Sequence, residues 1–148
     1  MNNDNDPLTQ LYGTGWQFPV SFSTPAMGNH AESSLQMSAG SDNVRQSLKL
    51  LFSTQPGERM MLPSWGCDLQ SSMFASLAEG PLAALQTRIA EGVARYEPRA
   101  ENVAVRVEKD STQHSTLNIT VTYHLSGQSR QISGQLNVLE GGGTAWAI

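Results

Sequence analysis

The sequence predicts an α+β fold: a small antiparallel sheet, made of a three-strand C-terminal meander plus N-terminal extended strands, covered by two or three helices. Two patterns carry this prediction. Between residues 82 and 96, apolar residues recur at spacings of three and four, as on one face of a helix. Segments 103–109, 116–125 and 129–138 instead alternate apolar and polar residues, as strands do. Because the helical patterns come before a run of consecutive strands, we expect these strands to pair as an antiparallel meander.

The long helix has a defined start and end. Pro81 stands in its first turn, where a missing N–H costs nothing. Pro98 disfavours helical geometry at Glu97, so the helix should end near Tyr96. The residues expected on its buried face are Leu82, Leu85, Ile89, Val93 and Tyr96. In the clearest strand, 116–125, the buried face is expected to carry Leu117, Ile119, Val121 and Tyr123.

The first half of the chain predicts shorter elements. We expect a helix over 43–53, a short strand around 35–37 and a short helix over 69–77, separated by irregular segments that contain Pro and Gly. Residues 16–22 place a large apolar residue at every second position, which predicts an extended segment with one buried side. Pro19 confines that segment to an edge. Four aromatic side chains are expected in the core: Trp16, Phe18, Trp65 and Phe74.

The two ends of the chain differ from its middle. Residues 1–10 are polar and predict a flexible lead, residues 11–138 form the folded domain, and residues 139–148 form a tail. Glycines at 141–143 make the tail a hinge. Beyond the hinge lie Thr144, Ala145, Trp146, Ala147 and Ile148. These residues have β character, so such an end can fray, or it can add as a strand to another chain's sheet. Trp146 follows the glycine hinge and has no local core to join.

Composition excludes several classes of protein. A length of 148 residues suits one domain, and a net charge of -4 supplies no basic footprint for nucleic acid. No segment approaches the roughly 20 apolar residues of a membrane span, and no signal peptide is visible. The one cysteine, Cys67, excludes an internal disulfide and suits synthesis in a reducing cytoplasm. Since His30, His114 and His124 lack metal-ligand spacing with Cys67, we expect no metal and no cofactor.

A charged tripeptide, Glu97-Pro98-Arg99, stands between the long helix and the first strand of the meander. Arg99 offers a planar fork of donors for carboxylates or helix-end carbonyls, and Pro98 sets the angle of the chain. Such a corner is typical of a docking point for a partner. The residues alone also allow a second interpretation, in which Glu97 pairs within the chain with Arg59 or Arg95 and steadies the corner.

A second charged pair, Glu58 and Arg59, directly follows Pro56-Gly57. Pro-Gly is a turn pair, so the simplest interpretation of this segment is a turn. The other interpretation is that the loop supports the Glu97-Pro98-Arg99 corner or meets a neighbouring protein.

Four motifs occur in order along the chain: Gly13-Thr14-Gly15-Trp16-Gln17-Phe18-Pro19, the helix over 44–54 that ends in Thr54, Pro56-Gly57-Glu58-Arg59 with Pro63 and Gly66-Cys67, and Tyr96-Glu97-Pro98-Arg99. In this order they resemble the small baseplate wedge subunits of contractile phage tails. That family has relatives in type VI secretion systems, R-type pyocins and extracellular contractile injection systems. The resemblance covers about residues 11–138 of the chain.

The resemblance implies a structural role in an assembled phage-tail-like particle. Such subunits belong to the baseplate wedge around the tail tube, with six copies expected, and provide the platform on which the first ring of sheath subunits forms. Their fold is similar to the strand-exchanging core of sheath subunits. The resemblance implies that Glu97, Pro98 and Arg99 dock on a helical core bundle of the larger wedge proteins. The candidate supporting loop of Glu58 and Arg59 rests on its own residues and not on the resemblance. We expect residues 144–148 to contact the sheath, on the physical character of the tail and not on the family pattern.

Two other functions remain open at this point. Some members of the family carry a lysozyme-like label, and a peptidoglycan hydrolase needs two carboxylates that flank a cleft. The acids available are Glu58, Asp68, Glu79, Glu91, Glu97 and Glu101. Glu97 and Glu101 flank a turn, but no pattern marks a general acid or an aromatic-lined sugar groove, so we expect no enzyme. A regulatory adaptor would instead bind one signalling protein through an edge strand, in a one-to-one complex.

Overall fold

A computed structural model describes residues 7–24, 33–71, 79–138 and 144–147. The chain forms two structural units, of which the first ends at Ser47 and the second begins at Leu48. Helix α2 (Gly40–Ser53) contributes residues to both.

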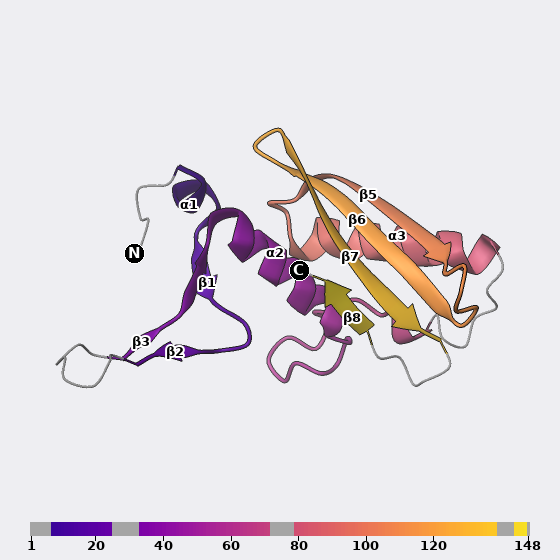
Figure 1. Cartoon of the computed structure of the whole chain (residues 1–148), viewed down its shortest axis with the longest axis horizontal. Helices are drawn as coiled ribbons and strands as arrows, with labels where there is room; N and C mark the ends of the chain where they lie inside the picture. The colour runs from indigo at the N-terminus through magenta and orange to yellow at the C-terminus, as the bar shows by residue number, and fades with distance from the viewer. Residues whose placement is uncertain (1–6, 25–32, 72–78, 139–143, 148) are drawn as a thin grey trace. The chain divides into compact units, whose positions relative to one another are not determined.

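The second unit is an antiparallel sheet with helix α3 (Glu79–Tyr96) across one face (Figure 1). Its strands, in spatial order, are β5 (Glu101–Lys109), β6 (Thr116–Leu125), β7 (Gln128–Asn137) and β8 (Thr144–Ala147). The predicted α+β class, the long helix and the three-strand meander are confirmed. Strand β8 adds a fourth strand to that meander, because it pairs antiparallel with β7.

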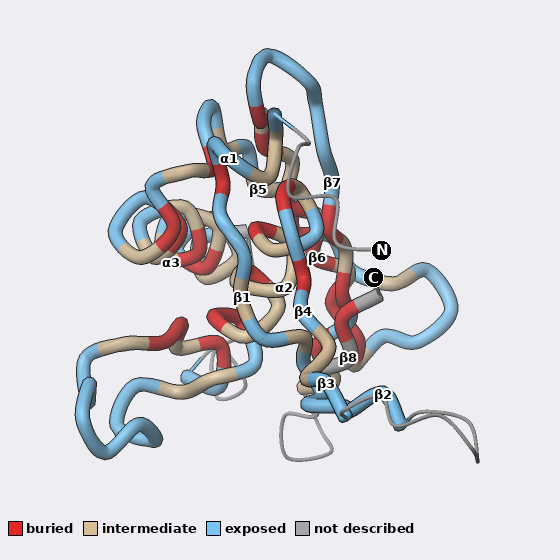
Figure 2. Tube along the Cα trace, turned by 90° about the vertical axis from the view of Figure 1, so that its left-hand side faces the viewer, coloured by how far each residue is buried: buried red, intermediate tan, exposed pale blue. Residues whose placement is uncertain are grey.

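The core of this unit combines the apolar face of α3 with the inward face of the sheet, as the red segments of these elements show (Figure 2). The buried residues of α3 are Leu85, Ile89 and Val93, and those of β6 are Leu117, Ile119, Val121, Tyr123 and Leu125. All of these except Leu125 are residues that the periodicity predicts, whereas Leu82 and Tyr96, which it also places on the buried face of α3, are half-buried. The last turn of α2 adds Leu48, Leu51 and Phe52, all at most 1% exposed.

The hairpin between β6 and β7 has a two-residue turn, Ser126-Gly127. Both residues have positive φ angles, 48° and 76°. Positive φ at both central positions is the signature of a type I′ turn, whose twist matches that of the flanking strands. The turn therefore sets the register in which Leu125 lies opposite Gln128.

The hairpin between β5 and β6 is closed by one carboxylate. Oδ1 of Asp110 accepts hydrogen bonds from the backbone N–H groups of Thr112 and Gln113 and from the Thr112 hydroxyl, at 2.6–3.0 Å. Oδ2 accepts one from the Asn118 side chain at 3.0 Å. These hydrogen bonds, led by the one from the Thr112 side chain, hold the pKa of Asp110 well below its usual range.

We expect Asp110→Asn to destabilise the chain more at neutral pH than in acid. The folded-state pKa of Asp110 is depressed, so its stabilising effect is present above the unfolded pKa, about 3.9, and is lost as the pH falls through the lower folded value. Urea unfolding of both proteins at about pH 7 and about pH 3 measures this change. Glu108→Gln, which alters a carboxylate that is 61% exposed, is the control. A difference between wild type and Asp110→Asn that does not vary with pH would contradict the prediction.

The first unit contains helix α1 (Pro7–Tyr12), part of α2 and four short strands. Strand β1 (Thr14–Trp16) pairs with β4 (Met37–Ala39), and β2 (Phe22–Ser23) pairs with β3 (Ser34–Leu35). The short strand expected at 35–37 thus lies within a longer extended segment. Residues 7–10, expected in a flexible lead, lie in α1, and residues 1–6 are outside the described part of the chain.

The prediction that residues 16–22 bury one side is wrong. Trp16 is 68% exposed, Phe18 50% and Phe22 65%. The reason is that the other face of these strands packs inward, where Gly15 and Ser38 lie beside Asn43 of α2. Of the remaining aromatic predictions, Trp65 is half-buried, and Phe74 lies outside the described residues together with most of the helix expected at 69–77.

Candidate partner-binding site

The Glu97-Pro98-Arg99 corner is built by the end of α3 and the start of β5. The N–H of Glu97 still donates to the carbonyl of Val93 at 2.8 Å, so Glu97 continues the last helical turn. The N–H of Ala100 donates back to the carbonyl of Glu97 at 3.1 Å and closes a tight turn. Since Ala100 is buried and Pro98 is exposed, the chain reverses with its proline outward.

Glu97 and Arg99 form a bidentate ion pair inside this turn. Nε and Nη2 of Arg99 each donate to one oxygen of the Glu97 carboxylate, both at 2.6 Å. The hydrogen bond to Glu97 raises the pKa of Arg99 above its ordinary value. The Glu97 side chain is 2% exposed and the Arg99 side chain is 32% exposed. Glu97 is therefore the buried partner that orients the guanidinium, and Arg99 is the charged residue at the surface of the corner.

This arrangement corrects the sequence interpretation in one respect. If Glu97 paired within the chain, the expected partners were Arg59 and Arg95, yet the partner is Arg99 two residues away. The helical end-turn explains the difference, because it brings residues 97 and 99 onto one side of a reversal that spacing in the sequence does not reveal. The Arg95 guanidinium instead lies 5.2 Å from the ring centre of Tyr96.

The loop from Thr54 to Cys67 is braced at several points. The N–H of Cys67 donates to the carbonyl of Thr54 at 3.0 Å, and that of Gly57 to the carbonyl of Pro63 at 2.7 Å. Gly66 is required at the closing point, since a Cβ there would lie 2.6 Å from the Thr54 oxygen. The Glu58 carboxylate caps the loop by accepting from the N–H of Gln55 at 2.9 Å.

This loop also reaches the residue that precedes the corner. The Arg59 guanidinium stacks 4.5 Å from the ring centre of Trp65, and the Trp65 ring lies 6.3 Å from that of Tyr96. The Tyr96 hydroxyl donates to the carbonyl of Ser64. Glu58 and Arg59 thus belong to a hydrogen-bonded loop that contacts the corner at Tyr96 through Trp65 and Ser64.

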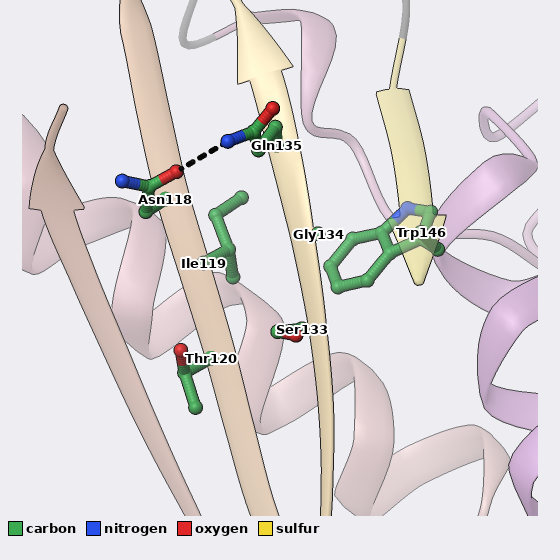
Figure 3. Close-up of a pocket in the computed structure, with 7 residues that line it drawn as sticks. All are labelled: Asn118, Ile119, Thr120, Ser133, Gly134, Gln135 and Trp146. Carbon is green, nitrogen blue, oxygen red and sulfur yellow. Dashed lines mark hydrogen bonds between the residues drawn. The ribbon is translucent and has the colours of Figure 1, made fainter. Parts of the chain in front are cut away.

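The tail forms the edge of the sheet in its own chain. Trp146 of β8 lies opposite Gly134 of β7, and its indole ring covers that glycine (Figure 3). The ring also stacks on Phe52 of α2, with centroids 4.6 Å apart and planes at 30°. Trp146 is 8% exposed, so the inference that it has no local core to join is wrong. Phe52 is distant in sequence, and a periodicity argument does not detect such a partner.

Two pockets bear on whether the chain could catalyse a reaction. The larger, about 490 Å³, lies on the sheet and is lined by Asn118, Ile119, Thr120, Ser133, Gly134, Gln135 and Trp146 (Figure 3). Its polar groups are neutral amides and hydroxyls, which supply no general acid or base. Beside the smaller pocket, of about 210 Å³, burial raises the pKa of Cys67 to about 11, so its thiol stays protonated and is a poor nucleophile.

Neither a metal cluster nor a membrane-spanning helix occurs in the described ranges. No three His, Cys, Asp or Glu side chains there are arranged to hold a metal ion. No helix within the same ranges has both the length and the apolar character needed to cross a bilayer.

Three comparisons relate this chain to known proteins. Residues 38–130 match the family model of baseplate wedge protein gp25. The baseplate wedge protein gp25 of Enterobacteria phage T4 is 29% identical over 83 residues, which are 56% of this chain and 63% of the phage protein. The chain thus spans less than two thirds of that relative's length.

Solved structures give the same relationship. A chain in the six-fold symmetrised cryo-EM structure of the anti-feeding prophage baseplate has a TM-score of 0.73 and 34% identity, covering 82% of this chain and 91% of its own length. A crystal structure of a protein named as a tail lysozyme of Geobacter sulfurreducens (TM-score 0.61, 21% identity, 67% and 91% covered) shares the fold. So does a chain of the type VI secretion system baseplate complex (0.54, 16%, 64% and 89%). The chain belongs to the gp25 family of baseplate wedge proteins.

Proposed function

We propose that this chain is a non-enzymatic baseplate subunit that docks on a bundle of helices from larger wedge proteins through the Glu97-Pro98-Arg99 corner. The observation that carries the proposal is the bidentate pair, which orients a partly exposed guanidinium beside an exposed proline. Within the corner, Arg99 and Pro98 make the contact, and Glu97 positions Arg99.

Preorganisation makes Arg99 a favourable contact residue. A free arginine loses much rotamer freedom when a partner immobilises it, and each ordered side chain of this kind costs about 0.5–1.5 kcal/mol on binding. Arg99 is already ordered by two 2.6 Å hydrogen bonds to Glu97. A planar guanidinium in a known orientation suits the carbonyl groups at a helix end or a carboxylate on a helix surface. A helical bundle offers both kinds of acceptor.

The C-terminal strand is the proposed contact to the sheath. Among the residues that the structure describes, strand β8 is the last strand of the sheet, so one side of its backbone pairs with β7 and the other is a sheet edge. An edge strand can pair with an extended segment of another protein. We infer that Thr144, Ala145, Trp146 and Ala147 receive such a segment from the first sheath ring. Ile148 belonged to the same prediction and lies outside the described residues.

The proposed location of this subunit is the assembled particle. We infer that the subunit is made in the cytoplasm and then enters the baseplate in six copies around the tube, and the six-fold symmetrised baseplate of the anti-feeding prophage supports that number. The subunit needs no cofactor, metal, nucleic acid or membrane in this role.

The site geometry also supports a non-enzymatic role. Both oxygens of Glu97 accept hydrogen bonds from Arg99, and a glycosidase general acid must instead carry a proton to the leaving group. The Asp68 carboxylate is also engaged, because it accepts from the N–H of Ser71 at 3.0 Å and lies 4.0 Å from the Arg88 guanidinium. The likeness to the Geobacter sulfurreducens structure extends to the fold alone.

The docking role is tested with the double variant Glu97→Gln/Arg99→Gln. Two neutral amides keep a hydrogen-bonded pair in the corner but remove the guanidinium, so the chain should stay folded while its incorporation into particles falls by roughly tenfold or more. Quantitative mass spectrometry of purified particles measures the copy number, and thermal unfolding of the purified chain checks the fold. Arg106→Gln, at an arginine whose side chain is 75% exposed, is the control. A normal copy number in the double variant would refute the docking role.

The sheath contact is tested by removing residues 141–148. Electron microscopy of such particles should show baseplates with tubes but without sheath. Trp146→Ala serves as the comparison, since it removes the ring that packs on Phe52 but keeps the backbone of the strand. Normal sheaths on the truncated chain would disprove this part of the proposal.

A further inference from the structure

A second candidate interface lies in the first unit, in the N-terminal β-ribbon formed by residues 14–24 and 33–39. The N–H of Gln17 donates to the carbonyl of Gln36 at 3.0 Å, and the N–H of Gln36 donates to the carbonyl of Ser21 at 2.9 Å. Residues 34–39 therefore form one extended segment, in which β4 pairs with β1 and β3 pairs with β2. The chain between Gln17 and Ser21 loops out of this pairing and carries Phe18.

The ribbon has its polar face inward and its apolar face outward. On the inward face, Ser38 is 7% exposed, and a Cβ on Gly15 would lie 2.6 Å from the Asn43 side chain. On the outward face, Trp16 lies opposite Met37, and Phe22 lies opposite Leu35. A two-stranded ribbon on a free protein would normally turn these side chains toward its own core.

The ribbon is held in place by specific hydrogen bonds. The N–H of Phe18 donates to the Gln46 side chain of α2 at 2.9 Å, and the Ser38 hydroxyl donates to the Asn43 side chain at 3.5 Å. The Ser23 and Ser34 hydroxyls pair at 2.6 Å across the strands. The outward apolar face is consequently preorganised, which lowers the entropy that a partner must remove on binding.

The ribbon is also free of charge. Residues 7–24 and 33–39 contain no Asp, Glu, Lys, Arg or His. Charge depletion with enrichment in aromatic residues and methionine is the composition of the buried centre of a protein interface. We propose that the outward face of the ribbon, formed by Trp16, Phe22 and Met37, binds an uncharged apolar surface on a different protein of the baseplate, together with the exposed Phe18 of the chain that loops out between Gln17 and Ser21. This inference rests on the baseplate role proposed above.

The size of the face argues against an isolated dimer of this chain and for one contact within a larger assembly. Aromatic side chains offer about 150–250 Å² each, so the exposed parts of the four residues amount to roughly 500 Å². A stable two-protein interface needs about 800 Å² on each side. The face is thus too small to hold a dimer by itself but large enough to mark an interaction site. Such an area suits one of several contacts that an assembly makes simultaneously.

A lipid surface is a poorer fit for the same face. Peripheral membrane contacts combine apolar insertion with Lys or Arg that bind anionic headgroups, and the ribbon supplies neither cation. The four residues of the proposed surface also lie outside the part of the chain that matches the family model, because that match begins at residue 38.

The test replaces two outward residues, Trp16→Ser/Phe22→Ser, in cells that assemble the particle. Incorporation of the chain should fall by roughly tenfold or more, because each buried aromatic contact in an interface centre is worth a large share of the affinity. The purified variant should unfold at the wild-type temperature or above, since neither side chain is in the core. Met61→Ser, at a residue that is 91% exposed in the second unit, is the matched control.

Three results would overturn the inference. The first is wild-type incorporation of the double variant. The second is a purified wild-type dimer, seen by light scattering at micromolar concentration, that the double variant abolishes, since the occupant would then be a second copy. The third is wild-type binding to phosphatidylcholine–phosphatidylglycerol vesicles that the double variant loses. If the baseplate role itself fails, Glu97→Gln/Arg99→Gln also leaves incorporation unchanged, whereas a failure of the ribbon contact alone leaves that corner variant defective.

Discussion

A valine in place of Gly134 is expected to displace Trp146 and to lower the free energy of unfolding by about 3–5 kcal/mol, the usual cost of losing a buried tryptophan. A Cβ on residue 134 would lie 2.5 Å from Cε3 and 2.6 Å from Cδ2 of the indole, well inside van der Waals contact. The ring cannot move inward, because it already stacks on Phe52 at 4.6 Å. Strand β8 should therefore separate from β7, and urea unfolding measures the loss.

A double-mutant cycle identifies the cause. In the Trp146→Ala background the indole is absent, so Gly134→Val should cost far less than it does in the wild type. Ser133→Val is the matched control, since residue 133 is the neighbour of Gly134 on β7 and its side chain is on the opposite face of the strand. Equal costs for Gly134→Val in both backgrounds would show that the glycine matters for its backbone and not for the indole.

Removal of Arg99 is expected to destabilise the chain more than removal of Glu97. Arg99→Ala leaves a carboxylate that is 2% exposed without its guanidinium, and stranding a buried charge costs about 3–5 kcal/mol. Glu97→Ala leaves a guanidinium that is 32% exposed and can turn toward water, so we expect about 1–3 kcal/mol. Thermal and urea unfolding of the two single variants measure this asymmetry.

The double variant Glu97→Ala/Arg99→Ala completes the cycle for the corner. If the two side chains act as one ion pair, the double variant should be less destabilised than the sum of the single variants, because no charge is left stranded. Additive losses would mean that the two residues contribute independently of their 2.6 Å contacts. The double variant Glu97→Gln/Arg99→Gln separates folding from docking, since it should stay folded and still lose docking.

Much of the second unit could be predicted from the sequence. The apolar spacing of α3 and the alternation of β6 reflect a helix and a strand that each bury one face against the same core, so the pattern and the fold agree. Pro98 likewise marks the end of α3, which ends at Tyr96. Glu97 and Arg99 could also be selected as candidate site residues, because two opposite charges at a helix-to-strand junction are unusual in a chain with 15% charged residues.

Period-two alternation misled at the N-terminus. It shows that Trp16 and Phe22 share a face with each other, but it carries no information on which face of a two-stranded ribbon meets the protein. Only the contacts of Gly15, Ser38 and Asn43 reveal that the polar face is inward. A ribbon that exposes its apolar face departs from the usual burial of apolar side chains, and such departures are expected where a surface binds a partner.

The sequence by itself determined the α+β class, the long helix, the meander and the position of the charged corner, because each depends on local periodicity or on a proline. The tertiary structure alone decided which side chain Glu97 holds, where Trp146 packs and which way the ribbon faces. These three depend on how distant segments or chain reversals bring groups together: residue 97 meets residue 99 across a turn, and residue 146 meets residue 52 across most of the chain. The spacing of apolar residues predicts neither of these two contacts, because it describes the faces of one helix or one strand at a time.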